Sequence, residues 1–346
     1  MPASGVPAHR THQPNPAIGY LLVLVAVGAF VVNAGVSRIV LTTGISAPEL
    51  SALRAVGTTA VIGIVIVATG RAHTLRVRRD EVPTLLAYGV VGVALLHMTY
   101  FVAIERLPIG LALLLEYLAP VLVALWVRFV RRQPVRAALW PALGLCLIGL
   151  ALVAEVGGGA SGLDPVGVLA GLGAAVSFAT YFLLGERMVA HRDPVSTTFW
   201  GFSVAAVLWS LLVPWWDALA IATRTSVTLP ATMGAATVPL ALLVAWVAVL
   251  GTLVPFGAAT AALRHLPATT VTVVAILEPV GAALLAWWWF DESQTLSQLI
   301  GVALVLTGIV LALRARVVRT PPPLLSPPTL GEQPPPGTPR GAAPRD

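Results

Sequence analysis

Ten long apolar blocks separated by short polar connections decide what this chain can fold into. Each block has about 20 residues, the length that an α-helix needs to cross the ~30 Å hydrocarbon layer of a bilayer. The blocks lack the alternating polar positions of a barrel strand, so we expect helices, which satisfy their own backbone groups in hydrocarbon. The blocks are Ala17–Ser37, Leu50–Thr69, Val82–Ile104, Ile109–Val130, Ala137–Ala154, Val166–Leu184, Thr197–Trp216, Val238–Leu263, Ala268–Phe290 and Leu296–Leu313.

Composition excludes a soluble fold. Only 10% of the 346 residues are charged and 57% are hydrophobic, whereas a soluble domain carries roughly a quarter charged residues. We therefore expect an all-α integral membrane protein with ten transmembrane helices. No cleavable signal peptide is expected, because the residues before Ala17 are polar and the first block is long enough to span. The single cysteine, Cys146, excludes an intramolecular disulfide.

Arginine placement predicts the orientation in the membrane. Arginines gather before the first block, in every second connection and after the tenth block, and few lie on the opposite side. By the positive-inside rule, both termini are cytoplasmic in a multi-pass plasma-membrane protein, and this alternation requires ten spans. No basic soluble domain exists that would bind nucleic acid. The arginines of the cytoplasmic side are Arg10, Arg71, Arg76, Arg78, Arg79, Arg128, Arg131, Arg132, Arg136, Arg187, Arg192, Arg264, Arg314, Arg316 and Arg319.

An internal repeat relates the two halves of the chain. The segment Glu105–Pro120 is echoed 159 residues later by Arg264–Pro279, with a Leu-Pro pair near the start and a proline at the end of both. Five spans per copy is an odd number, so the copies insert with opposite orientation. Such inverted repeats build secondary transporters around a midplane site. The alternative is a duplication that only enlarges the bundle.

The repeat sets the expected domain organisation. Residues 17–154 and 166–313 form two five-helix repeats, preceded by a cytoplasmic tail at 1–16. Residues 320–346 are rich in proline and are expected to form a disordered cytoplasmic tail. Whether this tail binds a partner is left open.

The motifs of the two halves resemble those of the drug/metabolite transporter superfamily, in the group with two EamA domains. They comprise Leu-Pro-x(11)-Pro in both halves, Arg54 early in the second block, Leu277–Val280, and Asp291-Glu292 followed by Gly301 and Gly308. The stretch Leu115–Pro120 resembles the branch that includes amino-acid exporters. One departure is Gln133, which stands in the first half where the second has Glu292.

Three ionisable residues inside the blocks are the leading site candidates. A charge at the membrane centre costs at least roughly 2.5–3.5 kcal/mol, so such groups indicate function. Glu116 and His97 both lie about 10 Å below the outer interface and flank a short turn, which predicts a His97–Glu116 pair that binds a proton or a substrate ammonium group. Arg54 lies in the same half of the membrane. The alternatives are a hydrogen bond from His97 to a backbone carbonyl and an Arg54 side chain that reaches the outer interface.

Further candidates lie around helix-breaking prolines. Glu278 directly precedes Pro279, and Pro120 closes the equivalent segment, so both prolines are candidates for a helix break or gate. A functional and a structural role for Glu278 both remain open. Four more polar residues line the expected cavity or serve packing only: Asn33, Tyr100, Tyr117 and Tyr181.

Tryptophans and glycines have structural interpretations. Trp287–Trp289 and the pair Trp215-Trp216 end outer spans and are expected to anchor the interface, with a substrate gate as the alternative. Close helix packing explains four glycines: Gly144, Gly149, Gly301 and Gly308.

These features favour a secondary transporter that moves a small organic solute. The chain lacks a nucleotide-binding G-x-x-x-x-G-K-[ST] loop, so a proton or solute gradient would supply the energy. The resemblance implies export of an amino acid or related metabolite, with drug efflux as the alternative. An intramembrane enzyme would need a nucleophile with a base or a metal cluster, which the sequence lacks, and a passive scaffold would not need buried carboxylates. We expect no cofactor and no metal, with a small-molecule substrate and lipid as partners; a homodimer is compatible with the sequence.

Overall fold

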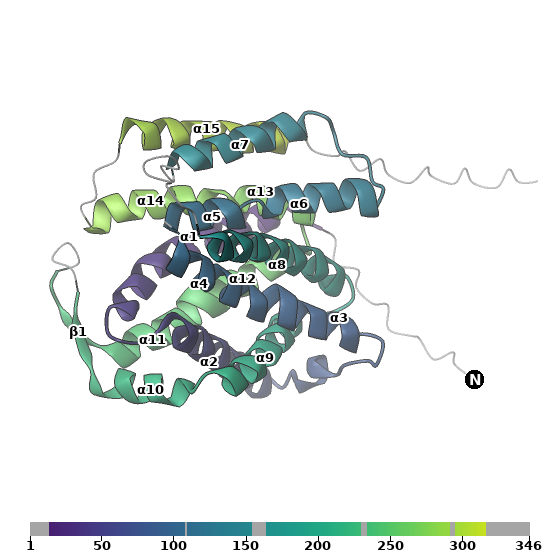
Figure 1. Ribbon diagram of the computed structural model, residues 1–346. Helices are drawn as coiled ribbons and strands as arrows, with labels where there is room; N and C mark the ends of the chain where they lie inside the picture. The colour runs from purple at the N-terminus through teal and green to yellow at the C-terminus, as the bar shows by residue number, and fades with distance from the viewer. Residues whose placement is uncertain (1–13, 108, 154–163, 230–233, 291–294, 316–346) are drawn as a thin grey trace, which may run out of the picture. The chain divides into compact units, whose positions relative to one another are not determined.

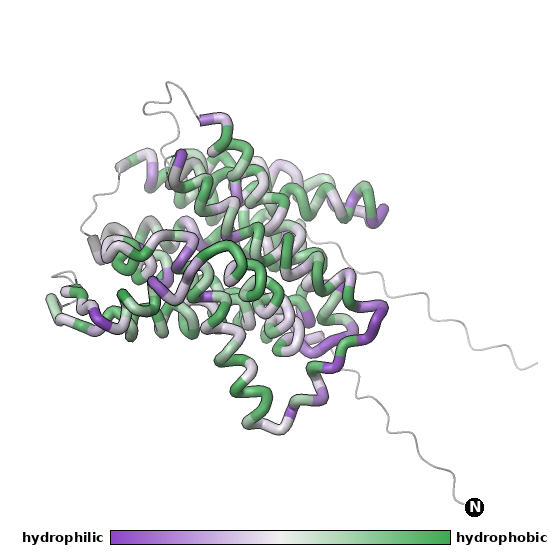
Figure 2. Tube along the Cα trace, turned by 60° about the horizontal axis from the view of Figure 1, so that its bottom comes forward, coloured by the Kyte–Doolittle hydropathy of each residue, from purple (hydrophilic) through white to green (hydrophobic). Residues whose placement is uncertain are grey.

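The computed structural model describes residues 14–107, 109–153, 164–229, 234–290 and 295–315. They are mainly helical, which confirms the predicted all-α membrane class (Figure 1). Within these ranges, eight helices are long and apolar enough to cross a membrane, and two shorter apolar helices accompany them. Hydrophobic residues cover much of the helical tube, and strongly hydrophilic ones gather at turns (Figure 2).

Helices of the first half correspond to the first five blocks. Blocks three and four are each assembled from several consecutive helical segments. The elements are α1 (Pro16–Leu41), α2 (Ala47–Ala68), the 3-10 turn η1 (Ala72–Leu75), α3 (Val82–Ala87), the π-helical η2 (Tyr88–Leu95), α4 (Leu96–Arg106), α5 (Ile109–Glu116), α6 (Ala119–Leu125), the π-helical η3 (Trp126–Val130) and α7 (Leu139–Val153).

The second half repeats this order and adds a short helix and a hairpin after its second span. The elements are α8 (Pro165–Val189), α9 (Pro194–Leu212), α10 (Trp215–Arg224), β1 (Ser226–Thr228), β2 (Thr237–Pro239), α11 (Leu240–Ala248), the π-helical η5 (Val249–Leu253), α12 (Val254–Ala262), α13 (Ala268–Ala275), α14 (Leu277–Phe290) and α15 (Leu296–Arg314).

The predicted end of the seventh block was wrong. We expected Trp215 and Trp216 to finish that span, but α9 ends at Leu212 and the tryptophans begin the separate helix α10. Pro214 causes the break, since a proline pushes the preceding residue out of the helical region, and Val213 is extended with φ −137°. Two antiparallel strands, β1 and β2, then lead into α11.

Helix irregularities occur at equivalent places in both halves. The fourth block breaks between α5 and α6, two residues before Pro120, and the ninth breaks at Ile276, just before Pro279. Each proline lacks the amide that would bond to the carbonyl one turn earlier. The third and eighth blocks both contain a π-helical segment, η2 and η5, which the sequence analysis did not predict.

Each half packs its first helix against the other half. Helix α1 contacts α12, α13 and α14, and helix α8 contacts α4, α5 and α6. A glycine permits the close approach in both places: a Cβ on Gly19 would touch Leu266, and one on Gly167 would touch Leu107. Leu107 and Leu266 belong to the repeated Leu-Pro segments, so these segments hold the halves together.

Helices α7 and α15 form a tight pair through small residues (Figure 1). A Cβ on Gly149 would lie 2.7 Å from the carbonyl oxygen of Gly301, and one on Gly308 would lie 2.9 Å from that of Ala142. The pairing of 149 with 301 and of 142 with 308 means that the helices run antiparallel. The close packing predicted at Gly144 was wrong, because a Cβ there has nothing within 4 Å.

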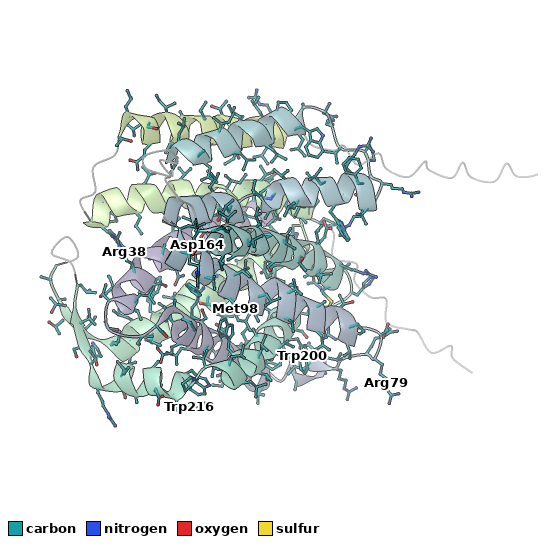
Figure 3. The ribbon with its side chains drawn as sticks, viewed as in Figure 1. Arg38, Arg79, Met98, Asp164, Trp200 and Trp216 are labelled. Carbon is teal, nitrogen blue, oxygen red and sulfur yellow. The ribbon has the colours of Figure 1, made fainter. Side chains whose placement is uncertain are left out.

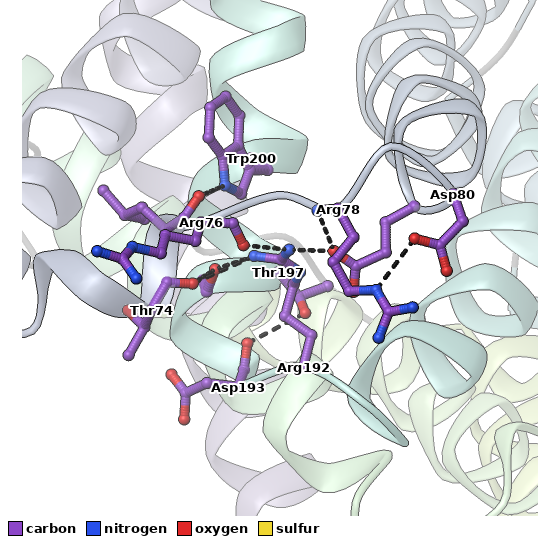
Figure 4. A network of polar contacts seen from close by, with 11 residues as sticks. Thr74, Arg76, Arg78, Asp80, Arg192, Asp193, Thr197 and Trp200 are labelled. Atoms are coloured by element: carbon purple, nitrogen blue, oxygen red, sulfur yellow. Dashed lines mark hydrogen bonds and ion pairs between the residues drawn. The ribbon is translucent and has the colours of Figure 1, made fainter.

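A buried arginine ties a connection of the first half to one of the second (Figure 4). Arg192, between α8 and α9, donates to the carbonyl oxygen of Arg76 at 2.8 Å and to Glu81 at 2.6 Å. It also bonds to Ser196 and to the carbonyl oxygen of Thr74. Desolvation acts to raise the pKa of Glu81, but hydrogen bonds from the Arg78 amide and from Arg192 outweigh it and lower the pKa below the ordinary value.

Glu81→Gln is expected to lower the melting temperature of the purified protein at neutral pH. Because the pKa of Glu81 is lowered by folding, its stabilisation is complete above the ordinary glutamate pKa of 4.5 and is lost as pH falls through the lower folded value. The difference from wild type should therefore vanish in acid. Asp80→Asn is the matched control, since the Asp80–Arg78 ion pair is exposed. An equal effect of both substitutions would contradict this interpretation.

Candidate functional site

A cluster of charged side chains lies in the apolar interior where the two halves meet. Arg54 comes from α2, Glu116 from the end of α5 and Glu278 from the start of α14. Arg54 interacts electrostatically with Glu278, and Glu278 with Glu116. Tyr100 on α4 lies within electrostatic range of all three. The cluster therefore combines one cation and two carboxylates from both halves of the chain.

Arg54 is buried, with 8% of its surface exposed, so its side chain does not extend to the protein surface. Its Nε donates to Oγ1 of Thr252 at 2.8 Å, and Thr252 in turn donates to the carbonyl oxygen of Val247 at 2.7 Å, five residues earlier. This spacing belongs to the π-helical η5, so the helix irregularity positions the partner of Arg54. Within the described residues, the terminal guanidinium nitrogens make no hydrogen bond. A buried cation with unused donors is suited to an anionic ligand.

Glu278 is joined to the first half by a direct hydrogen bond. Tyr117 donates its hydroxyl proton to Oε2 of Glu278 at 2.7 Å. Tyr117 lies at the break between α5 and α6, and its ring packs edge-on against Phe178 of α8. Both helix interruptions therefore meet at this bond, which the sequence analysis did not predict.

Glu116 has a different environment. It precedes Tyr117 at the same break, is only partly buried, and receives no hydrogen bond from any residue that the structure describes. Its carboxylate interacts electrostatically with that of Glu278. An acceptor without a donor, beside a second carboxylate, can take up a proton or a cationic group.

The predicted His97–Glu116 pair is not formed between the described side chains. His97 is buried, and its Nδ1 bonds instead to the carbonyl oxygen of Val93 at 2.7 Å, one turn earlier. Its ring lies against Phe256 and Phe202, with centroids 5.5 and 6.5 Å away. We expected the two side chains to lie at the same depth and to face each other. In the structure, the rotation of α4 about its axis turns His97 toward these rings.

The remaining polar candidates divide into two groups. Tyr100 belongs to the cluster, and Asn33 packs against Gly251 of η5, next to the partner of Arg54. Tyr181 instead serves packing: its hydroxyl bonds to the Phe256 carbonyl oxygen at 3.0 Å, and its ring stacks on Tyr88.

Polar contacts also join the halves at the ends of the Leu-Pro segments. Asp164, which is labelled in Figure 3, lies at the start of α8. It forms an ion pair with Arg106 at 2.9 Å. This bond lowers the pKa of Asp164. At the equivalent place in the other half, the amide of Asn15, at the start of α1, donates to His265 at 3.1 Å. The contacts are equivalent in position, but only the first is an ion pair.

Among the described residues, no group of three or more His, Cys, Asp or Glu side chains could hold a metal ion. The motif Asp291-Glu292, residue Pro108 and the proline-rich tail lie outside the described residues.

The fold and the cluster define a helical, multi-pass membrane protein with a charged interior shared by two similar halves. A family model described as the EamA-like transporter family matches residues 17–154 and 165–314. The chain belongs to this family, and it is a permease of the drug/metabolite transporter superfamily.

Relatives of known and unknown function are similar over most of the chain. The threonine/homoserine exporter RhtA of Escherichia coli strain K12 is 28% identical over 265 residues, 76% of this chain and 81% of that protein. An uncharacterized transporter of Archaeoglobus fulgidus is 29% identical over 222 residues, 62% of this chain and 71% of the relative. A solved crystal structure with 22% identity has a TM-score of 0.67 and covers 86% of this chain and 98% of its own, which shows the same fold.

Proposed function

We propose that this permease exports a small amino acid or a related metabolite by alternating access. One observation carries the proposal: a buried arginine with unused donors and a carboxylate that accepts no hydrogen bond from the described residues belong to one charged cluster, in which both interact with Glu278. An α-amino acid presents the complementary pair, a carboxylate and an ammonium group. The similarity to a threonine/homoserine exporter supports the same substrate class.

In this proposal, Arg54 binds the carboxylate of the solute and Glu116 binds its ammonium group or a proton. Because Glu116 holds only one of these at a time, competition between them couples export to proton entry. Tyr117 holds Glu278 in place. The breaks near Pro120 and Pro279 let the outer and inner helix segments move separately, since they lack continuous backbone bonding.

Ten spans in two inverted repeats, residues 17–154 and 166–313, complete the proposal. Support comes from α7 and α15, which are equivalent under the 159-residue shift yet antiparallel in contact. Under that shift the contact of Gly149 with Gly301 becomes the contact of Gly308 with Ala142, as a two-fold relation requires. Arginine placement supports cytoplasmic termini in the plasma membrane.

Efflux of an amphipathic cation is the second candidate. It is favoured by the two carboxylates and by the rings of Tyr117 and Phe178 beside them, since aromatic faces attract organic cations. Counterflow in proteoliposomes against a panel of amino acids and organic cations separates the two. Exchange of small neutral amino acids is expected, and exchange of organic cations alone would contradict the proposal.

Glu116→Gln is expected to lower amino-acid counterflow by about 10- to 100-fold and to remove its dependence on a pH gradient, because a charged hydrogen bond of about 1.5–3 kcal/mol is lost. Radiolabelled substrate in proteoliposomes measures both effects. Asp217→Asn on α10 is the matched control, since Asp217 is exposed and lies far from the cluster in sequence and on another helix. Unchanged counterflow and pH dependence in Glu116→Gln would remove Glu116 from the mechanism.

A further inference from the structure

A groove of about 560 Å³ lies between the start of α7 and the end of α15, away from the charged cluster. Its position follows from the packing of these helices, because Ala142 both touches Gly308 and lines the groove. The lining residues are Arg136, Ala138, Pro141, Ala142, Leu145, Leu311, Arg314 and Ala315.

The groove combines apolar walls with two cations. Leu145 and Leu311 contribute apolar walls, while the exposed side chains of Arg136 and Arg314 provide the charge, one from each helix. Within the described part of the chain, neither guanidinium forms an ion pair or a hydrogen bond to another residue. The sequence adds charge on both sides, with Arg132 before α7 and Arg316 after α15.

We propose that this groove binds an anionic phospholipid, with the phosphate between Arg136 and Arg314 and an acyl chain along Leu145 and Leu311. Basic pockets between membrane helices hold lipid head groups in this way, and guanidinium groups match phosphate oxygens. The proposal concerns a site separate from that of the transported solute and does not depend on the substrate or on the membrane orientation.

Two other occupants fit less well. Free phosphate would satisfy the arginines but leave the apolar walls without a partner. A second copy of the chain, docked symmetrically through this face, would bring the arginines of one copy against those of the other. An acyl chain linked to a phosphate satisfies the walls and the charges together.

Native mass spectrometry of the full-length protein in detergent tests the site, with phosphatidylglycerol and phosphatidylcholine of equal chain length as probes. Phosphatidylglycerol is expected to bind more tightly, and Arg136→Ala with Arg314→Ala should weaken it by about 30-fold, since each arginine contributes about 1 kcal/mol. Arg136→Lys with Arg314→Lys should retain most of the binding. The control pair, Arg187→Ala with Arg264→Ala, removes equal charge from exposed positions elsewhere and should leave it nearly unchanged.

Four results would overturn the proposal. Equal binding of both lipids, or equal losses in the two double alanine variants, would mean general surface attraction. Competition by inorganic phosphate at low concentration would mean an ion site. A change in the monomer–dimer equilibrium with unchanged lipid affinity would mean an interface between copies. Melting temperatures of all variants establish that they are folded.

Discussion

Arg54→Gln is expected to reduce amino-acid counterflow in proteoliposomes by about 100-fold, the largest effect of any single substitution on transport. The guanidinium is buried and held at Nε by Thr252, and its terminal nitrogens have no hydrogen-bond partner among the residues that the structure describes. Loss of a charged hydrogen-bonding group from such a site costs about 3 kcal/mol of solute binding.

Two variants separate binding from general electrostatics. Arg224→Gln removes an exposed arginine from the end of α10 and should leave counterflow unchanged. Arg54→Lys retains the positive charge but lacks the planar guanidinium group, which can donate two parallel hydrogen bonds to a carboxylate. It should therefore recover only part of the activity. Full activity in Arg54→Gln, or an equal loss in Arg224→Gln, would show that Arg54 does not bind the solute.

Gly149→Ala is expected to destabilise the protein by about 2 kcal/mol, a large effect for a single methyl group. A Cβ at this position would lie 2.7 Å from both the Gly301 carbonyl oxygen and the Val305 amide nitrogen, so backbone on α15 must move. The free energy of unfolding in mixed micelles, or the melting temperature in detergent, measures the effect.

Gly144→Ala on the same helix provides the comparison. A Cβ there meets nothing within 4 Å, and alanine has the higher helix propensity, so stability should stay equal or rise slightly. The two substitutions are chemically identical and differ only in whether α15 is close. Equal effects of both would contradict the observed packing of α7 against α15.

Much of the fold follows from the sequence because few backbone structures allow apolar blocks of this length to span a bilayer. The repeat of Leu-Pro segments also predicted which parts are equivalent, and both segments contact the first helix of the opposite half. Helix α10 was missed because its tryptophans extend the apolar block beyond Pro214, and hydropathy alone does not show that a new helix begins there.

The candidate site was predicted only in part. Intramembrane charge identifies Arg54, Glu116 and Glu278, since burying an ionisable group is costly. The contact partners of these site residues were not predictable, because they depend on how each helix is rotated and on irregular helical segments. His97 faces Phe256 and not Glu116, and Thr252 is the partner of Arg54 in a π-helical segment that hydropathy does not reveal. Tyr117, which donates to Glu278, lies at a helix break whose geometry hydropathy does not specify.

We propose that the charged cluster lies on the path of the solute. Thiol labelling tests it directly, since the chain has one native cysteine, Cys146, which is buried between α7 and α15. Tyr100→Cys places a thiol in the cluster, and Met98→Cys places one on the exposed surface of the same helix (Figure 3).

A membrane-impermeant reagent is predicted to modify Tyr100→Cys from each side of the membrane in turn, and an amino acid that exchanges in the counterflow assay should slow the reaction. Met98→Cys, whose side chain lies on the exposed surface outside the cluster, should show no protection by the amino acid. A cysteine at position 100 that reacts from neither side, or reacts equally with and without the amino acid, would contradict the account.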